Sequence, residues 1–323
     1  MKIAITGGCG FIGSNLIRHL IRETDYSIVC IDRLSYSGNP ANIEEFRGNS
    51  RFEFVQADIC DVSAMDKVMS RVDGVINLAA ETHVDRSIDD ADDFLRTNIL
   101  GVETLMRAAK KYSVKRFLHM STDEVYGSIA QGKFTEASPI EPNSPYSASK
   151  ASADLLIRAY RETYGYSAII TRCTNNYGPY QYPEKVIPLF VTNLLAGKKV
   201  PLYGTGVNRR DWIHVDDAVR ALHLVFEKGN LGEVYNIGSD NELSNLELTH
   251  AILKNMGFDE SRIEYVADRP GHDLRYALDF SKVKALGFSP RYNVQDGLKH
   301  TIEWYQSRED WWKPLKQNKY TNK

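Results

Sequence analysis

Residues 2–13 read Lys2-Ile3-Ala4-Ile5-Thr6-Gly7-Gly8-Cys9-Gly10-Phe11-Ile12-Gly13. The apolar run predicts a buried β-strand, and the residues after it open an amphipathic helix with glycines in the spacing GxxGxxG. The first glycine permits a tight turn, the second lets backbone amides approach a pyrophosphate, and the third lets helix and strand pack closely. Because the helix N-terminus then faces the anion, the stretch predicts a dinucleotide site.

Short apolar runs continue to alternate with amphipathic segments through the first half of the chain. Strands are expected at residues 2–6, 27–31, 52–56, 74–78, 116–121 and 167–172. Two long helices are expected at residues 92–112 and 147–164. This alternation indicates βαβ units, so the sequence predicts an α/β fold with a doubly wound parallel sheet (Rossmann) and helices on both faces.

From about Tyr177 the sequence becomes richer in turns, Arg, Tyr and Asn, and its segments are shorter. We therefore expect a smaller, mixed α/β substrate-binding domain beside the first. The expected division gives residues 1–176 and about 211–240 to the dinucleotide-binding domain. Residues 177–210 and about 241–315 are expected to form the second domain.

Acidic residues end the second and third expected strands. Asp32 stands where a carboxylate accepts hydrogen bonds from an adenosine ribose, and Asp58 would lie beside the adenine. Asp32 would repel a 2′-phosphate, so NAD is favoured over NADP, although the neighbouring Arg33 leaves NADP open. The fourth strand ends in small residues (residues 77–81), which allow close approach of the cofactor.

Composition bounds the partners and the compartment. The net charge of −2 comes from 40 basic and 42 acidic residues that are interleaved, so a small-molecule partner is expected rather than nucleic acid or an anionic membrane. The four cysteines form no CxxC pair, and no apolar run approaches the ~20 residues of a membrane span. With a strand beginning directly after Met1, we expect a soluble cytoplasmic protein. The eight histidines form no ligand cluster, so no metal is expected.

Two short stretches carry side chains suited to redox chemistry and to loss of water. Ser121-Thr122-Asp123-Glu124 follows an apolar strand, and Tyr146 and Lys150 lie one turn apart at the start of a helix. A nearby ammonium, and the positive nicotinamide ring beside it, would lower the pKa of the phenol and let Tyr146 accept a proton as hydride leaves a sugar carbon. The adjacent carboxylates disfavour double ionisation, which helps keep one of them protonated near neutrality.

With these motifs the chain resembles the extended short-chain dehydrogenase/reductase family, and within it the nucleotide-sugar 4,6-dehydratases. The resemblance covers nearly all of the chain and rests on residues 7–13, 79–87, 121–127, 146–150, 175–181, 210–212, 268–273, 304–305 and 311–312. Most relatives in the wider family, including the epimerases, lack the Asp-Glu pair after Ser-Thr. Asp123 and Glu124 therefore indicate a dehydratase.

The resemblance implies NAD-dependent 4,6-dehydration of a nucleoside-diphosphate hexose, with dTDP-glucose as the expected substrate. Tyr146, supported by Lys150, would take the O4 proton as hydride leaves C4, while Thr122 hydrogen-bonds O4. Glu124 would remove the C5 proton, and Asp123 would protonate the departing C6 hydroxyl before hydride returns to C6. The alternatives are a dehydratase for UDP-glucose, an epimerase on the same scaffold, and a protein that binds NAD without chemistry.

The resemblance also assigns contacts residue by residue. Cofactor contacts are implied at Gly7, Gly10, Phe11, Ile12, Gly13, Asp32, Arg33, Leu34, Ser35, Asp58, Ile59, Ala79, Ala80, Glu81, Thr82, Thr97, Tyr146, Lys150 and Asn176. Substrate contacts are implied at His83, Thr122, Asn175, Lys185, Val186, Pro201, Leu202, Tyr203, Arg210, Asn245, Asp268, Arg269, Pro270, Gly271 and His272.

Two further expectations concern the diphosphate and the assembly. A diphosphate needs a cation, but Arg209 directly precedes Arg210 and leaves open which of them makes the contact. Core packing explains most of the apolar positions on the helices expected at residues 92–112 and 147–164, and the remainder are available to pair with a second subunit. Two such helices from each of two copies would form a four-helix bundle, so a homodimer is expected.

Overall fold

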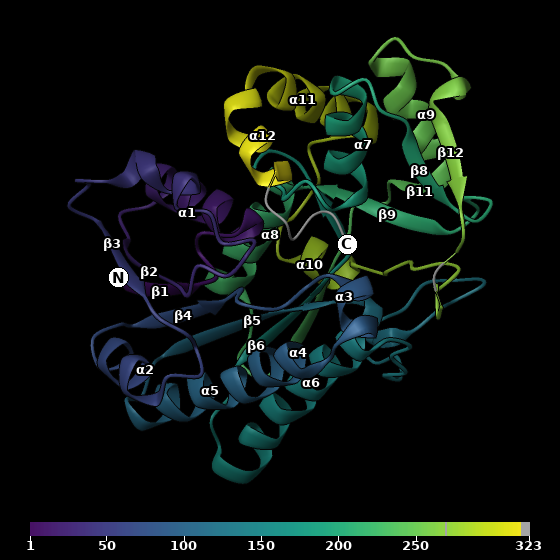
Figure 1. Cartoon of the computed structure of the whole chain (residues 1–323). Coiled ribbons are helices and arrows are strands. Elements are labelled where there is room, and N and C mark those ends of the chain that lie inside the picture. Colours follow the sequence, from purple (N-terminus) through teal and green to yellow (C-terminus); the bar gives the residue numbers. More distant parts are fainter. Residues whose placement is uncertain (269, 318–323) are drawn as a thin grey trace.

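The computed structural model describes residues 1–268 and 270–317, and its largest element is a parallel sheet (Figure 1). The sheet has seven strands in the order β10-β6-β5-β4-β1-β2-β3. These strands are β1 (Lys2–Thr6), β2 (Ser27–Asp32), β3 (Phe52–Gln56), β4 (Gly74–Asn77), β5 (Arg116–Thr122), β6 (Ile169–Cys173) and β10 (Val234–Ile237). The order reverses between β1 and β4, and ligands of doubly wound sheets bind at such switch points. The predicted fold class is confirmed.

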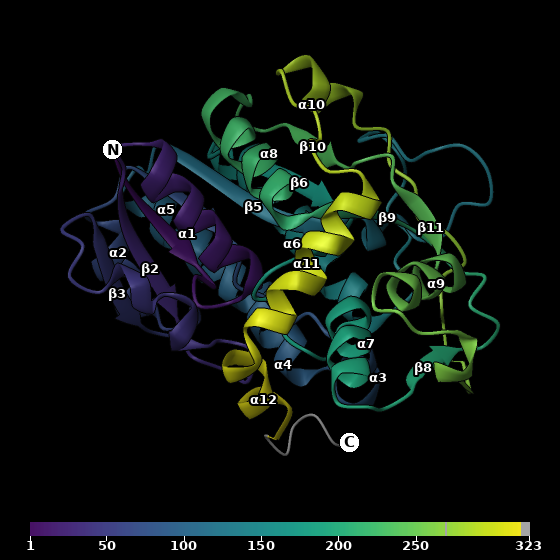
Figure 2. The same cartoon turned by 90° about the horizontal axis from the view of Figure 1, so that it is seen from above.

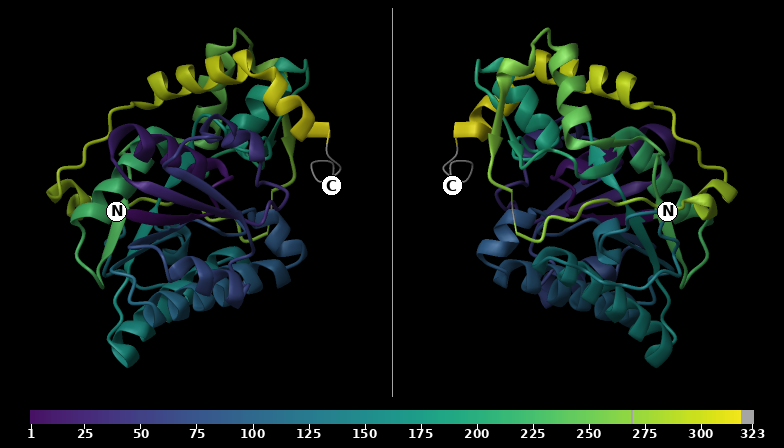
Figure 3. Two further views of the ribbon diagram at one scale, coloured as in Figure 1. Left: turned by 90° about the vertical axis from the view of Figure 1, so that its left-hand side faces the viewer. Right: turned by 90° about the vertical axis from the view of Figure 1, so that its right-hand side faces the viewer.

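Helices cover both faces of this sheet, as Figure 3 shows. One face carries α1 (Phe11–Glu23) and α8 (Val215–Lys228), which pack against each other. The other face carries α2 (Val62–Met69), α3 (Val84–Asp89), α4 (Asp92–Leu95), α5 (Val102–Lys111) and α6 (Pro145–Tyr164). Along β1 the side chains alternate between two buried cores, with Ile3 and Ile5 in one and Ala4 in the other.

The remaining elements gather on one side of the molecule, as seen from above in Figure 2. The helices are α7 (Val186–Leu195), α9 (Asn245–Asn255), α11 (Val294–Ser307) and α12 (Glu309–Gln317). The strands are β7 (Asn175–Tyr177), β8 (Val200–Tyr203), β9 (Arg209–His214), β11 (Glu242–Ser244) and β12 (Ile263–Val266). They form a three-stranded sheet β11-β9-β7 and the pair β12-β8, and they share a core of their own that includes Phe190, Trp212 and Tyr305.

One short helix lies in the first core despite its late position in the chain. α10 (Ser281–Ala285) contacts β10, and Phe280, Val283 and Phe288 are buried in the cluster that also holds residues of α1 and α8. These residues fall within the stretch that the sequence analysis assigns to the second domain. The exact division into domains stays a prediction.

The helix predicted at residues 92–112 is interrupted. α4 and α5 are joined by a π-helical segment, η3 (Arg96–Gly101), whose Asn98 side chain leaves the helix surface. The Asn98 amide accepts from the backbone N–H of Glu81 at 2.9 Å and donates to its carbonyl at 3.1 Å and to Ser149 Oγ at 2.9 Å. A π-helical turn is often found at a functional site, and this one places Thr97 in the wall of the cofactor cavity.

The short 3₁₀ turns are η1 (Pro40–Asn42), η2 (Glu44–Phe46), η4 (Asp123–Tyr126) and η5 (Glu260–Arg262). η4 follows β5 directly and carries the Asp-Glu pair of the sequence analysis. Within the described part of the chain, no helix is both long and apolar enough to cross a lipid bilayer.

Candidate active site

A cavity of about 280 Å³ opens at the carboxyl ends of β1, β2, β3, β4 and β5. The predicted cofactor residues that line it are Gly7, Gly10, Phe11, Ile12, Gly13, Asp32, Arg33, Ser35, Asp58, Ile59, Ala79, Ala80, Glu81, Thr82, Thr97, Tyr146 and Asn176. Leu34 and Lys150 do not line it. Lining residues that were not predicted from the sequence include Ser37, Gly38, Gln181, Tyr182 and Glu184.

At Gly7 and Gly13 the backbone packs so closely that a side chain would not fit. Gly7 has a φ of +68°, and a Cβ on it would lie 2.8 Å from the backbone nitrogen of Ala79. A Cβ on Gly13 would lie 2.2 Å from the carbonyl oxygen of Gly7. Gly10 begins α1 without any side-chain cap, so the helix N-terminus faces this cradle. The cradle fits the pyrophosphate of a dinucleotide.

The ribose end of the cavity is acidic. Asp32 accepts hydrogen bonds from the backbone N–H of Cys9 at 2.9 Å and of Leu34 at 2.8 Å. Arg33 pairs with Glu81 at 2.6 Å and with Asp58 at 3.4 Å. Its guanidinium is therefore already neutralised, and a 2′-phosphate would meet three carboxylates. This arrangement favours NAD over NADP and removes the ambiguity that Arg33 creates in the sequence.

Asp123 begins η4, directly after β5, in a position shielded from solvent. Its side chain is buried, and its Oδ2 has no hydrogen-bond partner among the described residues. Burial and the charge of Glu124 raise the pKa of the Asp123 carboxyl to about 7. The pair thus has the property expected from its sequence, in that one carboxyl is able to stay protonated near neutrality.

Tyr146 differs from the sequence-based expectation. Its pKa is raised, by burial first and then by the negative charge of Glu124, while a hydrogen bond with Thr122 opposes the rise. The lowering expected from Lys150 is not found. The Lys150 side-chain nitrogen is turned toward β5, where Nζ donates to the carbonyl of Met120 at 2.7 Å, and burial lowers the Lys150 pKa to about 8.

A second cavity, of about 190 Å³, adjoins the first. The predicted substrate residues that line it are His83, Asn175, Lys185, Val186, Pro201, Leu202, Tyr203, Arg210, Asn245 and His272. Thr122 lines the first cavity instead, Asp268, Pro270 and Gly271 line neither, and Arg269 lies outside the described residues. Unpredicted lining residues are Val84, Asp85, Glu184, Leu189, Phe190, Trp212 and Tyr276.

Four residues line both cavities: Glu124, Asn175, Glu184 and Lys185. Glu124 is the residue of this group that also belongs to the Asp-Glu pair. A ligand held in the second cavity would therefore reach the carboxyl groups at the inner end of the first. This junction places acid–base groups between a dinucleotide and a second ligand.

The two adjacent arginines, Arg209 and Arg210, have different surroundings. Arg209 pairs with Glu242 at 2.6 Å and with Glu247 at 3.3 Å, away from the cavity. Arg210 is buried in the cavity wall, where its guanidinium donates to the carbonyl of Asp273 at 2.8 Å and stacks 4.2 Å above the ring of Tyr276. Backbone carbonyls hold Arg210 in place without neutralising its charge, so it is the arginine able to meet an anion here.

His83 is a polar wall of the second cavity. Its Nδ1 is buried and has no hydrogen-bond partner among the described residues. Burial, followed by the charge of Lys185, lowers the His83 pKa to about 4. His83 therefore presents a neutral imidazole, which suits hydrogen bonding to a hydroxyl or a base edge.

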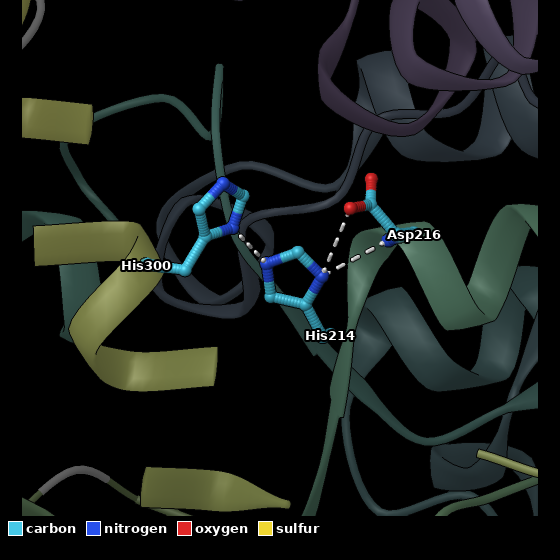
Figure 4. Close-up of side chains that lie close together, drawn as sticks. All are labelled: His214, Asp216 and His300. Carbon is cyan, nitrogen blue, oxygen red and sulfur yellow. Dashed lines mark hydrogen bonds and ion pairs between the residues drawn. The ribbon is translucent and has the colours of Figure 1, made fainter. Parts of the chain in front are cut away.

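One group of described residues has the composition of a metal site: His214, Asp216 and His300 (Figure 4). The His214 ring lies between the other two side chains. Its Nδ1 accepts from the Asp216 backbone N–H at 3.2 Å, and its Nε2 lies 3.2 Å from His300 Nδ1. One ligand atom from each residue lies within 4.8 Å of the others, but both ring nitrogens of His214 already face partners within this group. The expectation of no metal stays a prediction.

A doubly wound sheet, a dinucleotide cradle and an acid–base junction with a Tyr and a Lys on one helix define a dinucleotide-dependent enzyme of the short-chain dehydrogenase/reductase class. The comparison with family models makes the assignment more specific. The chain belongs to the GDP-mannose 4,6 dehydratase family, whose model matches residues 4–301.

Individual relatives agree with this family. The dTDP-glucose 4,6-dehydratase of Streptomyces niveus is 50% identical over 322 residues, which cover 98% of this chain and 96% of that protein. The structure of DesIV, a dTDP-glucose 4,6-dehydratase from Streptomyces venezuelae with NAD and TYD bound, has a TM-score of 0.96 and 49% identity, covering 98% of this chain and 100% of that one. UDP-glucose 4-epimerase from Thermotoga maritima, with UDP-glucose, is more distant at 33% identity and a TM-score of 0.88, with coverage of 95% and 99%.

Proposed function

We propose that this chain is an NAD-dependent dTDP-glucose 4,6-dehydratase, which converts its substrate to dTDP-4-keto-6-deoxyglucose. The observation that carries this proposal is the position of Glu124, which lines both cavities beside a buried Asp123 whose pKa is raised to about 7. An epimerase has no use for such a pair, because it removes no water. The relatives named above support the dehydratase over the epimerase alternative.

The first chemical step is oxidation at C4. NAD, when bound in the first cavity, supplies the acceptor for the C4 hydride and later returns hydride to C6. Tyr146 takes the O4 proton, and Thr122, which hydrogen-bonds with Tyr146, orients O4. Because burial and Glu124 raise the Tyr146 pKa, the phenol needs a positive charge nearby to act as a base.

The second step is loss of water across C5 and C6. The ketone at C4 acidifies the C5 proton, which Glu124 removes, while protonated Asp123 gives its proton to the C6 hydroxyl as water departs. Hydride then returns to C6 and a proton to C5. Each turnover leaves the O4 proton on Tyr146 and takes one proton from Asp123, so the two groups must exchange a proton before the next cycle.

Binding roles follow from the two cavities. We assign the cofactor to the first cavity and the sugar nucleotide to the second, with Arg210 rather than Arg209 at the diphosphate. Lys185 adds a second cation at the junction, and its Nζ also donates to the carbonyl of Thr82 at 2.8 Å. His83 and Asn175 supply hydrogen-bonding groups for the hexose.

The test uses purified protein, dTDP-glucose and no added NAD. Because the cofactor returns to its oxidised form in every cycle, retained NAD should suffice, and the product should show the alkaline absorbance of a 4-keto sugar. An absence of product even with NAD present would contradict the proposal. Formation of a 4-epimer in its place would support the epimerase alternative.

The base of the substrate is a separate question, since dTDP and UDP differ by one methyl group and one ribose hydroxyl. The DesIV structure carries TYD, which favours the thymine nucleotide for this chain as well. A competition assay with dTDP-glucose and UDP-glucose checks this preference. Preferential turnover of UDP-glucose would contradict it.

We also propose a homodimer through a four-helix bundle. Helices α4, α5 and α6 lie on one face of the sheet (Figure 3). On this helical layer, which includes η3, Leu100 is 60% exposed, Leu155 52% and Tyr164 55%. Leu155→Glu should give monomers in sedimentation experiments, whereas Leu231→Glu, at an exposed leucine elsewhere, should not. Dimers that survive Leu155→Glu would contradict the proposed interface.

A cytoplasmic location remains our proposal, and four free cysteines agree with a reducing compartment.

A further inference from the structure

His119 is a fully buried, titratable residue without a role in the chemistry proposed above. It lies on β5 and pairs across the sheet with Asn77 on β4, which pairs in turn with Thr6 on β1. All three are 0% exposed. The flanking positions of the same row, Ile31 on β2 and Ile170 on β6, are apolar. A polar row thus crosses the centre of an otherwise apolar sheet.

The side chains of this row form a continuous hydrogen-bond chain to Lys150. Thr6 Oγ1 donates to Asn77 Oδ1 at 2.5 Å, and Asn77 Nδ2 lies 2.9 Å from His119 Nδ1. His119 Nε2 lies 3.4 Å from Lys150 Nζ. Buried polar groups need partners, and each group of this chain finds one within it or in the adjoining backbone.

The far end of the chain fixes its direction. Thr6 Oγ1 accepts from the backbone N–H groups of Leu78 and Ala79, both at 3.2 Å, and Ala79 lines the cofactor cavity. With both lone pairs used, the Thr6 hydroxyl is able only to donate to Asn77, which turns the Asn77 amide nitrogen toward His119. His119 Nδ1 therefore accepts, and its ring hydrogen lies on Nε2, facing Lys150.

We propose that Thr6, Asn77 and His119 form a buried chain that sets the protonation state of Lys150, with His119 as the positioning residue. In the observed direction His119 donates to Lys150, and only the neutral amine has a lone pair to accept this hydrogen bond. If Lys150 were an ammonium, its N–H groups would face the Nε2–H of His119, and neither group could accept a hydrogen bond. The inference rests on the proposed function, in which Lys150 supports Tyr146.

Protonation of Lys150 must reverse the whole chain. The pair takes up one proton from solvent in total: Lys150 gains it, and the imidazole still carries one proton, now on Nδ1. The Asn77 amide rotates so that its oxygen accepts from His119 and its nitrogen donates to Thr6. Thr6 Oγ1 then faces three donors with two lone pairs, so the ammonium form carries a penalty that the amine does not.

The charged groups around Lys150 largely cancel, so the hydrogen-bond chain has a strong influence on the Lys150 pKa. Burial lowers the Lys150 pKa to about 8, and Asp154 on the same helix opposes the decrease. Arg172 on β6 pairs with Asp154 at 2.9 Å and offsets much of its charge. The pKa of His119 is lowered well below its ordinary value by burial and by Lys150, so this ring stays neutral and changes its tautomer instead. A lysine that titrates near working pH is suited to take up and release the proton left on Tyr146 in each turnover.

The first test follows the ring nitrogens of His119 by ¹⁵N NMR in the whole protein, assigned with the His119→Gln variant or, where that variant does not fold, with Asn77→Asp. We expect the Nδ1–H tautomer below the Lys150 pKa and the Nε2–H tautomer above it, between about pH 6 and about pH 10. A tautomer that stays constant over this range would overturn the inference. This readout does not depend on dehydratase activity.

The second test isolates C4 oxidation, seen as absorbance of reduced nicotinamide in a single turnover with dTDP-glucose. Asp123→Asn serves as the background, because it stalls elimination and removes the titration of Asp123. In this background, His119→Gln gives the Lys150 ammonium a carbonyl acceptor, so the alkaline limb of C4 oxidation should move up by at least about one pH unit, a tenfold change in the acid dissociation constant. Asn77→Asp should move it in the same direction, because a carboxylate only accepts.

The matched control is His250→Gln, at a half-exposed histidine near Glu260, which should leave the limb unchanged. If both His119→Gln and Asn77→Asp slowed C4 oxidation without moving its alkaline limb, Thr6, Asn77 and His119 would serve only in packing. This result would overturn the inference. Failure of the proposed function has a different signature, since the unaltered protein would then contain no NAD or form no product.

Discussion

The two cavities of this molecule are built in different ways. The first is shaped by backbone: the glycine loop, the ends of successive strands and the N-terminus of α1. The second is lined by side chains from α7, β8, β9 and loops that lie far apart in the sequence, such as Lys185, Tyr203, Arg210 and His272. Local sequence specifies a backbone cradle well, whereas a cavity made of distant side chains is known only once the chain is folded.

The largest expected effect lies at the junction of the cavities. Glu124→Gln should lower kcat for dehydration by about 10³-fold, because it removes the proposed base at C5 while leaving shape and cofactor cradle intact. Product formation and retained NAD are measured together. Glu44→Gln, at an exposed glutamate, is the control and should leave both unchanged. Near-normal turnover by Glu124→Gln would contradict the dehydratase proposal and favour the epimerase alternative.

The next largest effect is expected for Arg210, in the wall of the second cavity, compared with its surface neighbour Arg209. Arg210→Gln should raise KM for the sugar nucleotide by about 10- to 100-fold, since a charge-assisted hydrogen bond to a phosphate is lost in a buried wall. Arg209→Gln, one residue away in a surface ion-pair network, should change KM by less than about threefold. Steady-state kinetics of the two variants checks this, and equal effects would contradict the placement of the diphosphate.

The pH dependence tests Asp123, at the inner end of the first cavity. The protonated carboxyl is the active form, so activity should be full below its pKa of about 7 and fall up to about tenfold per unit above it. Since the folded-state pKa lies above the ordinary value for an aspartate, the free energy of unfolding should decrease as pH rises from about 4 to about 7 and then level off. Asp123→Asn should lose activity and remove this part of the decrease, as measured by denaturant titration at several pH values.

The smallest effect is expected at the ribose end. Arg33→Gln breaks partly exposed ion pairs with Asp58 and Glu81, so retained NAD should fall by no more than about tenfold. NADP should remain a poor cofactor, because Asp32, Asp58 and Glu81 would repel its 2′-phosphate. Improved use of NADP by this variant would contradict the electrostatic argument.

Sequence reasoning succeeded where a pattern is local. The strands at residues 2–6 and 52–56 and the doubly wound fold follow from apolar periodicity and glycine spacing. The helix expected over residues 92–112 is present as α4, η3 and α5, but its π-helical segment was missed, and there Asn98 hydrogen-bonds Glu81 and Ser149, which are distant in sequence. The Tyr146 pKa is raised by burial and Glu124 rather than lowered by Lys150, and the lowering expected from the nicotinamide ring stays a prediction.

The sequence by itself determined the sheet and the cofactor cradle, because strand periodicity and glycine spacing are properties of neighbouring residues. It also predicted the acid–base groups, from the Asp123-Glu124 pair and the one-turn separation of Tyr146 and Lys150. The tertiary structure alone decided which arginine faces the second cavity, how Arg33 is neutralised, and how Thr6, Asn77 and His119 connect to Lys150. These are matters of burial and electrostatics. Their energies depend on which side chains folding brings together, and no local pattern records that.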